Sequence, residues 1–86
     1  MPEPDLHSLP MIRPQQVRAA RALLGWPRER LAKAAGVGAS TIKAFENETT
    51  DTRLSIARAI EAALVKAGVV FLEPDQHGGP GVRLRK

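Results

Sequence analysis

The sequence has no cysteine and no tyrosine, and only two phenylalanines and one tryptophan among its 86 residues. The absence of thiols excludes disulfides, a cysteine nucleophile and a thiolate zinc site. No apolar run approaches the roughly 20 residues of a membrane span. The first five residues are acidic and contain two prolines, whereas a signal peptide is basic and then apolar. We therefore expect a soluble protein of the cytoplasm.

The residues needed for catalysis or metal binding are also sparse. His7 and His77 are the only histidines, and neither has a second ligand at a suitable spacing. The run Gly78-Gly79-Pro80-Gly81 lacks the following Lys-Ser/Thr of a phosphate-binding loop, so a turn is the simpler interpretation. No serine has a His or Lys partner in a plausible triad. The sequence therefore predicts no enzyme, no cofactor and no metal site.

The charge is basic overall and unevenly distributed. The formal net charge is +4, and residues 13–68 carry ten bases against five acids, whereas residues 1–12 carry two acids and no base. A pI near 10.4 is typical of proteins with a polyanionic partner, although a solvated basic surface has the same composition. A chain this short buries only about 60% of its unfolded surface, so oligomerisation is a reasonable supplement to its stability.

Proline, glycine and apolar spacing predict four helices. Residues 1–12 contain three prolines and no periodicity, which indicates a flexible arm. Helices are expected over residues 14–24, 28–35 and 39–47, and a fourth with Ser55 as its N-cap, or starting one turn earlier, that ends at Gly68.

The last 18 residues have a different pattern. Two short runs, 69–72 and 82–85, flank a segment rich in glycine and proline, which predicts a β-hairpin with a long loop. An isolated hairpin is marginally stable in water, so we expect its strands to pair with another chain or to dock on the helices. The candidate dimerisation residues in these strands are Val69, Val70, Phe71, Leu72, Val82 and Leu84.

Residues 28–47 have the pattern of a helix-turn-helix. Ala32 allows the two helices to approach closely, and Gly36 can adopt turn dihedrals that a Cβ would resist. Val37, Ile42 and Phe45 are expected to fill the angle between the helices. The face of the second helix that this arrangement leaves outside has short side chains and one base, and suits a major groove about 12 Å wide. Its members are Ala39, Ser40, Lys43 and Ala44.

At these residues the chain resembles the Xre family of phage-repressor and Cro-type regulators, over about residues 12–68. The resemblance is carried by Arg21-x-x-Leu24-Gly25-Trp26, Leu31-Ala32-x-x-Ala35-Gly36-Val37 and Thr41-Ile42-x-x-Phe45-Glu46-Asn47. It implies a mainly α, lambda-repressor-like helical bundle that binds double-stranded DNA as a homodimer on a near-palindromic operator.

The resemblance also assigns roles to residues. It implies that the four outward residues face bases and that Arg21 and Glu46 form a structural ion pair, which explains a charge on the apolar stripe of the first helix. It places Gly38, Thr41 and Arg28 near the DNA backbone, with Arg28 where the family often has Gln. In the following loop the candidates for backbone contact are Thr49, Thr50 and Arg53.

Three features depart from the family pattern. Pro27 and Gly38 occupy positions where the family often has a capping Ser, Thr or Asn. Glu48 and Asp51 place two acids in the loop that normally contacts phosphate. The strand-like tail, residues 69–86, replaces the usual fifth helix, and we interpret it as the dimerisation element that follows an arm (1–12) and a DNA-binding domain (13–68).

The sequence therefore predicts a DNA-binding transcriptional regulator, a repressor acting as a homodimer. The alternative is a protein-interaction module, such as an antitoxin or a protein that sequesters another regulator. The two differ in their salt response, because phosphate contacts weaken steeply with salt and apolar interfaces do not.

Overall fold

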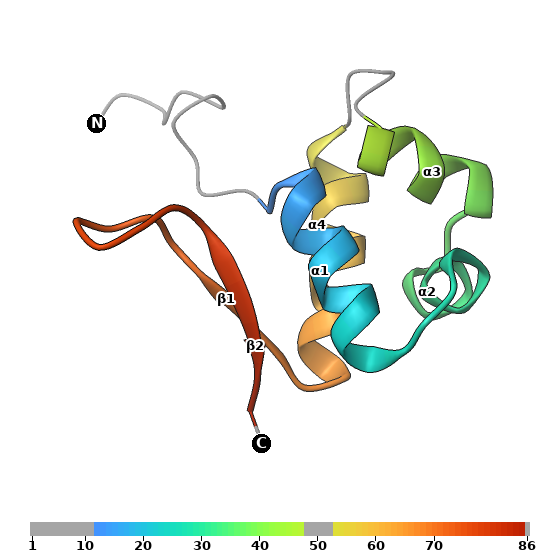
Figure 1. The fold of residues 1–86 in the computed structure, drawn as a ribbon. Helices are drawn as coiled ribbons and strands as arrows, with labels where there is room; N and C mark the ends of the chain where they lie inside the picture. The colour runs from blue at the N-terminus through green and yellow to red at the C-terminus, as the bar shows by residue number, and fades with distance from the viewer. Residues whose placement is uncertain (1–11, 48–52, 86) are drawn as a thin grey trace, which may run out of the picture.

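The computed structural model describes residues 12–47 and 53–85, and this part of the chain forms four helices followed by two strands (Figure 1). The predicted class, a mainly α fold with a C-terminal hairpin, is confirmed. The elements are α1 (Pro14–Leu24), α2 (Arg28–Ala35), α3 (Ala39–Asn47), α4 (Leu54–Lys66), β1 (Val69–Leu72) and β2 (Gly81–Leu84).

Local sequence determines both ends of α1. Pro14 begins the helix, where its missing N–H leaves no donor unpaired, and the N–H of Arg13 donates to Oε1 of Gln16 at 2.9 Å. The helix ends at Gly25, whose φ of 68° lies in the left-handed region. The N–H of Trp26 then donates to the carbonyl of Arg21 at 2.9 Å, which closes the last turn. Both predicted ends of this helix are confirmed.

Helix α4 begins between the two predicted starts, two residues before the one that takes Ser55 as the N-cap. The N–H groups of Ile56 and Ala57 donate to the carbonyl of Arg53, at 3.0 and 3.1 Å, so Arg53 is the N-cap and Ser55 lies inside the first turn. No side chain caps this end. The apolar face predicted for this helix is confirmed, because Ala57, Ile60 and Leu64 are buried.

The strands form an antiparallel hairpin, in which Val69 pairs with Leu84 and Phe71 with Val82. The second strand begins at Gly81, one residue earlier than predicted, because Gly81 pairs with Leu72 at the far end of the register. The hairpin docks on the helices of its own chain, with β2 against α1 and β1 against α4.

Gln16 attaches this hairpin to α1. Its Nε2 donates to the carbonyl oxygens of Leu72, at 3.3 Å, and Gly81, at 3.0 Å. These two residues face each other across the strands, so one amide holds both. Gln16 is 6% exposed, and a buried amide of this kind is expensive to leave unpaired. A polar side chain therefore fixes where the hairpin lies on the helical bundle.

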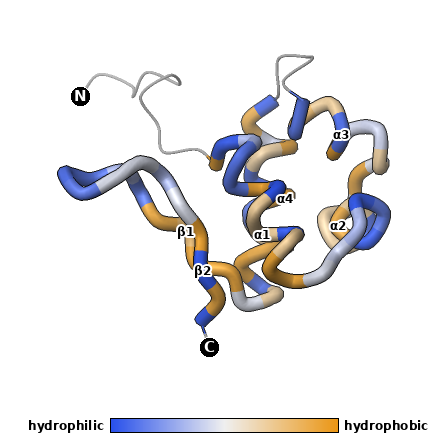
Figure 2. Tube along the Cα trace, viewed as in Figure 1, coloured by the Kyte–Doolittle hydropathy of each residue, from blue (hydrophilic) through white to orange (hydrophobic). Residues whose placement is uncertain are grey.

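Helices α1 and α4 separate the hairpin from α2 and α3 (Figure 1). The strands are apolar where they pass the helices, and the tip of the hairpin is hydrophilic (Figure 2). The core lies between the helices and continues to the first strand residue. Its buried apolar members are Ile12, Val17, Ala20, Leu31, Ala32, Ile42, Phe45, Ala57, Ile60, Ala63, Leu64 and Val69.

Candidate nucleic-acid interface

A tight glycine turn sets the angle between α2 and α3. Gly36 has a φ of 73°, and its N–H bonds the last turn of α2. A Cβ at this position would meet no atom within 4 Å, so glycine is favoured by its backbone conformation and not by lack of space. The N–H of Val37 then donates to the carbonyl of Ala32 at 3.0 Å. After this turn, α3 packs against α2.

Helix α3 is buried on one side and exposed on the other. Ile42, Phe45 and Glu46 are at most 4% exposed, which anchors the helix to the bundle. Ser40 and Lys43 are exposed on the other side. The remaining two residues expected to face bases, Ala39 and Ala44, are half-buried and lie at the margins of this face. The outer surface of α3 is therefore narrow, and its one long side chain is a lysine.

Glu46 lies at the end of α3 and is buried completely. Arg21 approaches it with two bonds, Nε to Oε2 at 2.6 Å and Nη2 to Oε1 at 2.9 Å. Its third nitrogen, Nη1, donates to the carbonyl of Trp26 at 3.0 Å. The structural ion pair implied by the family resemblance is thus present, and it connects α1 to both the turn after it and to α3.

Burial and hydrogen bonding act in opposite directions on Glu46. Burial alone would raise the pKa of its carboxyl group, but the hydrogen bonds and positive charges of Arg21 and Arg28 outweigh it and lower that pKa below the ordinary 4.5. The hydrogen bond to Glu46 raises the pKa of Arg21 in turn. Both groups therefore stay charged at neutral pH.

Two further arginines approach Glu46, and the sequence did not indicate either contact. Arg28 Nε donates to Oε1 at 2.9 Å, and Arg18 Nη1 donates to the backbone carbonyl of Glu46 at 2.7 Å. The bond from Arg18 satisfies a carbonyl in the last turn of α3, where no later N–H of the helix is available to donate to it. Nothing in the local sequence distinguishes Arg18 from other exposed bases on the helices.

Arg30, in the first turn of α2, stacks on an aromatic ring. The guanidinium carbon of Arg30 is 4.8 Å from the centre of the Trp26 ring, a distance typical of a cation–π contact. Trp26 itself is half-buried and packs against the core.

The residues expected near the DNA backbone are only partly described. Gly38 is exposed at the start of α3, Thr41 is half-buried one turn later, and Arg53 is exposed at the start of α4. Thr49 and Thr50 lie outside the described residues, as do the acids Glu48 and Asp51. Arg28 has an exposed side-chain fraction of 36%. It reaches the surface while bonded to Glu46.

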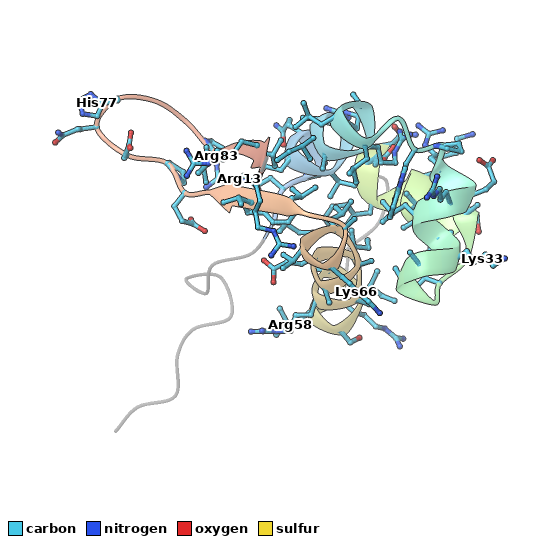
Figure 3. All side chains as sticks on the ribbon, turned by 90° about the horizontal axis from the view of Figure 1, so that it is seen from below. Arg13, Lys33, Arg58, Lys66, His77 and Arg83 are labelled. Atoms are coloured by element: carbon cyan, nitrogen blue, oxygen red, sulfur yellow. The ribbon has the colours of Figure 1, made fainter. Side chains whose placement is uncertain are left out.

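Other bases lie away from α3. Lys33 on α2 and His77 at the hairpin tip are at opposite ends of the molecule, and Arg58 and Lys66 project from α4 (Figure 3). The positive charge is therefore spread over several faces, and the charge of the whole chain does not by itself identify the interface.

The candidate dimerisation residues divide between the two faces of the hairpin. Val69, Phe71, Val82 and Leu84 pack against the core of their own chain. Leu72 is 37% exposed and lies two residues from the half-buried Val70. Of the six residues, Leu72 alone is exposed, Val69 is buried, and the other four are half-buried.

Other classes of site find no support in the described part of the chain. Within residues 12–47 and 53–85, no three His, Asp or Glu side chains are grouped to hold a metal ion. Over the same residues, no helix is long and apolar enough to span a membrane.

The profile of the helix-turn-helix family matches residues 17–64, more than half of the chain. The matched segment contains α2 and α3 completely, together with most of α1 and α4. The hairpin lies outside it. No curated protein matches the sequence.

Proposed function

Because the chain belongs to the Xre-type helix-turn-helix family, we propose that it is a repressor that binds a near-palindromic operator as a homodimer, with α3 in the major groove. The family is one of DNA-binding regulator domains and not of enzymes. We place this action on DNA in the cytoplasm.

The observation that carries this proposal is the division of α3 into a buried face and a narrow exposed one. Ile42 and Phe45 hold the helix in the bundle, which leaves Ser40 and Lys43 accessible. A lysine at this position can donate to O6 and N7 of guanine. Ala39 and Ala44 offer only methyl contacts with thymine, so DNA shape contributes part of the sequence preference.

DNA binding is tested with fragments of the DNA upstream of the gene, titrated with salt. We expect one fragment to bind more tightly than the others, with a logarithmic salt slope that reports several phosphate contacts, about 0.9 for each. Equal and salt-independent binding of all fragments would contradict the proposal.

The homodimer is proposed because one such domain neutralises few phosphates, and two half-sites raise affinity and specificity together. The hairpin is the proposed contact, through the exposed Leu72, the half-buried Val70 and its open strand edges. Deleting the whole tail is a poor test, because Val69 belongs to the core.

We therefore propose Leu72→Lys as the test of the dimer, with Leu23→Lys on α1 as the control, since both leucines are exposed. In sedimentation equilibrium, Leu72→Lys should shift the mass toward the monomer and Leu23→Lys should not. A dimer that withstands Leu72→Lys would exclude this contact.

A protein partner remains the second candidate, favoured by one surface feature. A shallow groove of about 420 Å³ is lined by Leu24, Ala67, Gly68, Leu84 and Arg85. Such a surface suits an apolar segment of a protein partner, either a toxin that this chain neutralises or another regulator that it sequesters. Binding of a partner there should change little with salt, unlike binding of DNA.

A further inference from the structure

Two arginines share the carboxylate of Glu46, but they use their nitrogens differently. All three nitrogens of Arg21 donate, two to Glu46 and one to the carbonyl of Trp26. Arg28 donates to Glu46 with Nε alone, and neither of its Nη atoms has an acceptor among residues 12–47 and 53–85. The side chain of Arg28 is also twice as exposed, at 36% against 18%.

The described charges around Glu46 have a positive excess. The guanidinium groups of Arg21 and Arg28 bond its carboxylate and that of Arg18 bonds its backbone carbonyl, and Glu29 is close enough to raise the pKa of Arg21. Among the described residues, three positive charges therefore meet two negative ones, and the side chain of Arg28 is partly exposed. An anion beside Arg28 would be attracted by this excess. The two Nη atoms, which have no acceptor in the part of the chain that the structure describes, match two oxygens of a phosphate group.

We infer that Glu46 is a positioning residue for a contact between Arg28 and a phosphate of the DNA backbone. The carboxylate fixes the plane of the guanidinium through Nε, which directs the two Nη atoms away from the protein. Arg28 thereby connects the end of α3 to the DNA backbone at the start of α2. This inference rests on the proposed DNA-binding function.

Arginine is needed for this role because one planar group must bind two anions at once. Lysine has a single nitrogen, so it can reach either the carboxylate or the phosphate with good geometry, but it keeps the charge. Glutamine has no charge. The substitutions Arg28→Lys and Arg28→Gln therefore separate positioning from charge.

The test is binding to a random-sequence duplex of roughly 30 base pairs, about three helical turns, over a range of salt concentrations. We expect Arg28→Lys to raise Kd about tenfold with an unchanged salt slope, because one charge-assisted bond is lost and the charge is kept. Arg28→Gln should also reduce the slope by about 0.9. The control is Arg58→Lys on α4, which should change neither quantity.

A double-mutant cycle assigns the positioning to Glu46. Glu46→Gln should weaken DNA binding in the wild-type background and have little further effect in the R28K background. A purely structural role would weaken binding equally in both. Circular dichroism checks that each variant is folded. If Glu46→Gln does not fold, the Kd of Arg28→Lys compared with that of Arg58→Lys decides whether the geometry of the Arg28 guanidinium contributes to DNA binding.

The possible outcomes test the positioning role of Glu46 separately from the proposed DNA binding. If the wild-type protein does not bind duplex DNA with a salt slope, both are overturned. If it binds and Arg28→Lys binds equally well, only the positioning role is overturned.

Discussion

Arg21 on α1 and Glu46 on α3 lie 25 residues apart in the sequence and are joined by two hydrogen bonds, at 2.6 and 2.9 Å. The pair connects the helix that holds the hairpin, through Gln16, to the helix that carries Lys43. A fully buried carboxylate destabilises the fold unless its charge is paired. The orientation of α3 therefore depends on an electrostatic contact as well as on apolar packing.

The two arginines at Glu46 should differ in their effect on stability. We expect Arg21→Met to lower the free energy of unfolding by about 2–4 kcal/mol, because it leaves a buried carboxylate short of its main partner. The matched variant Arg28→Met should lower it by less than about 1 kcal/mol, because this pair is partly exposed to solvent. Urea denaturation measures both, and equal losses would contradict the assignment of Arg21 as the main partner.

The lowered pKa of Glu46 predicts a loss of stability in acid. Since the carboxyl pKa lies below the ordinary 4.5 in the folded protein, the unfolded chain takes up a proton first as the pH falls. The stabilisation is present above about pH 4.5 and disappears as the pH falls through the folded-state value. Urea unfolding should show a shallower decline for Glu46→Gln than for the wild type. Parallel declines would mean that another group is responsible.

Gly38 offers a stabilising substitution. A Cβ there would lie 3.7 Å from Oγ of Ser40 and 3.8 Å from Oγ1 of Thr41, which are ordinary contacts. Gly38→Ser should raise the free energy of unfolding by about 0.5 kcal/mol, through a helix cap and a less flexible unfolded chain. Gly36→Ser is the control and should lower it by about 1 kcal/mol, because the φ of Gly36 is +73°. Thermal denaturation compares the two, and a loss at both positions would show that Gly38 is also constrained.

Gln16 should control the attachment of the hairpin. We expect Gln16→Met to lower stability by about 1–2 kcal/mol, and to speed amide exchange in β1 and β2 more than in α2 and α3. Gln15→Met is the matched control, since Gln15 is an exposed neighbour on the same helix. Uniform exchange in the Gln16 variant would indicate that apolar packing alone holds the hairpin.

The sequence predicted the features that depend on neighbouring residues. Pro14 and Gly25 define α1 because a missing N–H and a left-handed φ are properties of single residues. The buried positions of α3 followed from the three-residue spacing of Ile42 and Phe45. The start of α4 was left open over one turn, because Ser55 is a good cap by type, whereas the helix begins with the backbone of Arg53 and no side-chain cap.

The contacts of Arg18, Arg28 and Gln16 could not be predicted in this way. Each joins residues between 18 and 65 positions apart, so its partner is determined by the packing of helices and not by local pattern. An arginine near a helix start is usually solvated. Family resemblance supplied the pairing of Arg21 with Glu46, but Arg28 departs from the family pattern and gave no such signal.

The most direct test of the proposed function compares Lys43→Ala on α3 with Lys66→Ala on α4. Both lysines are exposed, and each variant removes one positive charge. Titrated on the preferred upstream fragment and on random-sequence DNA, Lys43→Ala should reduce the ratio of the two affinities about tenfold, because a base contact is lost, and Lys66→Ala should leave the ratio unchanged. An unchanged ratio for Lys43→Ala would contradict the placement of α3 in the major groove.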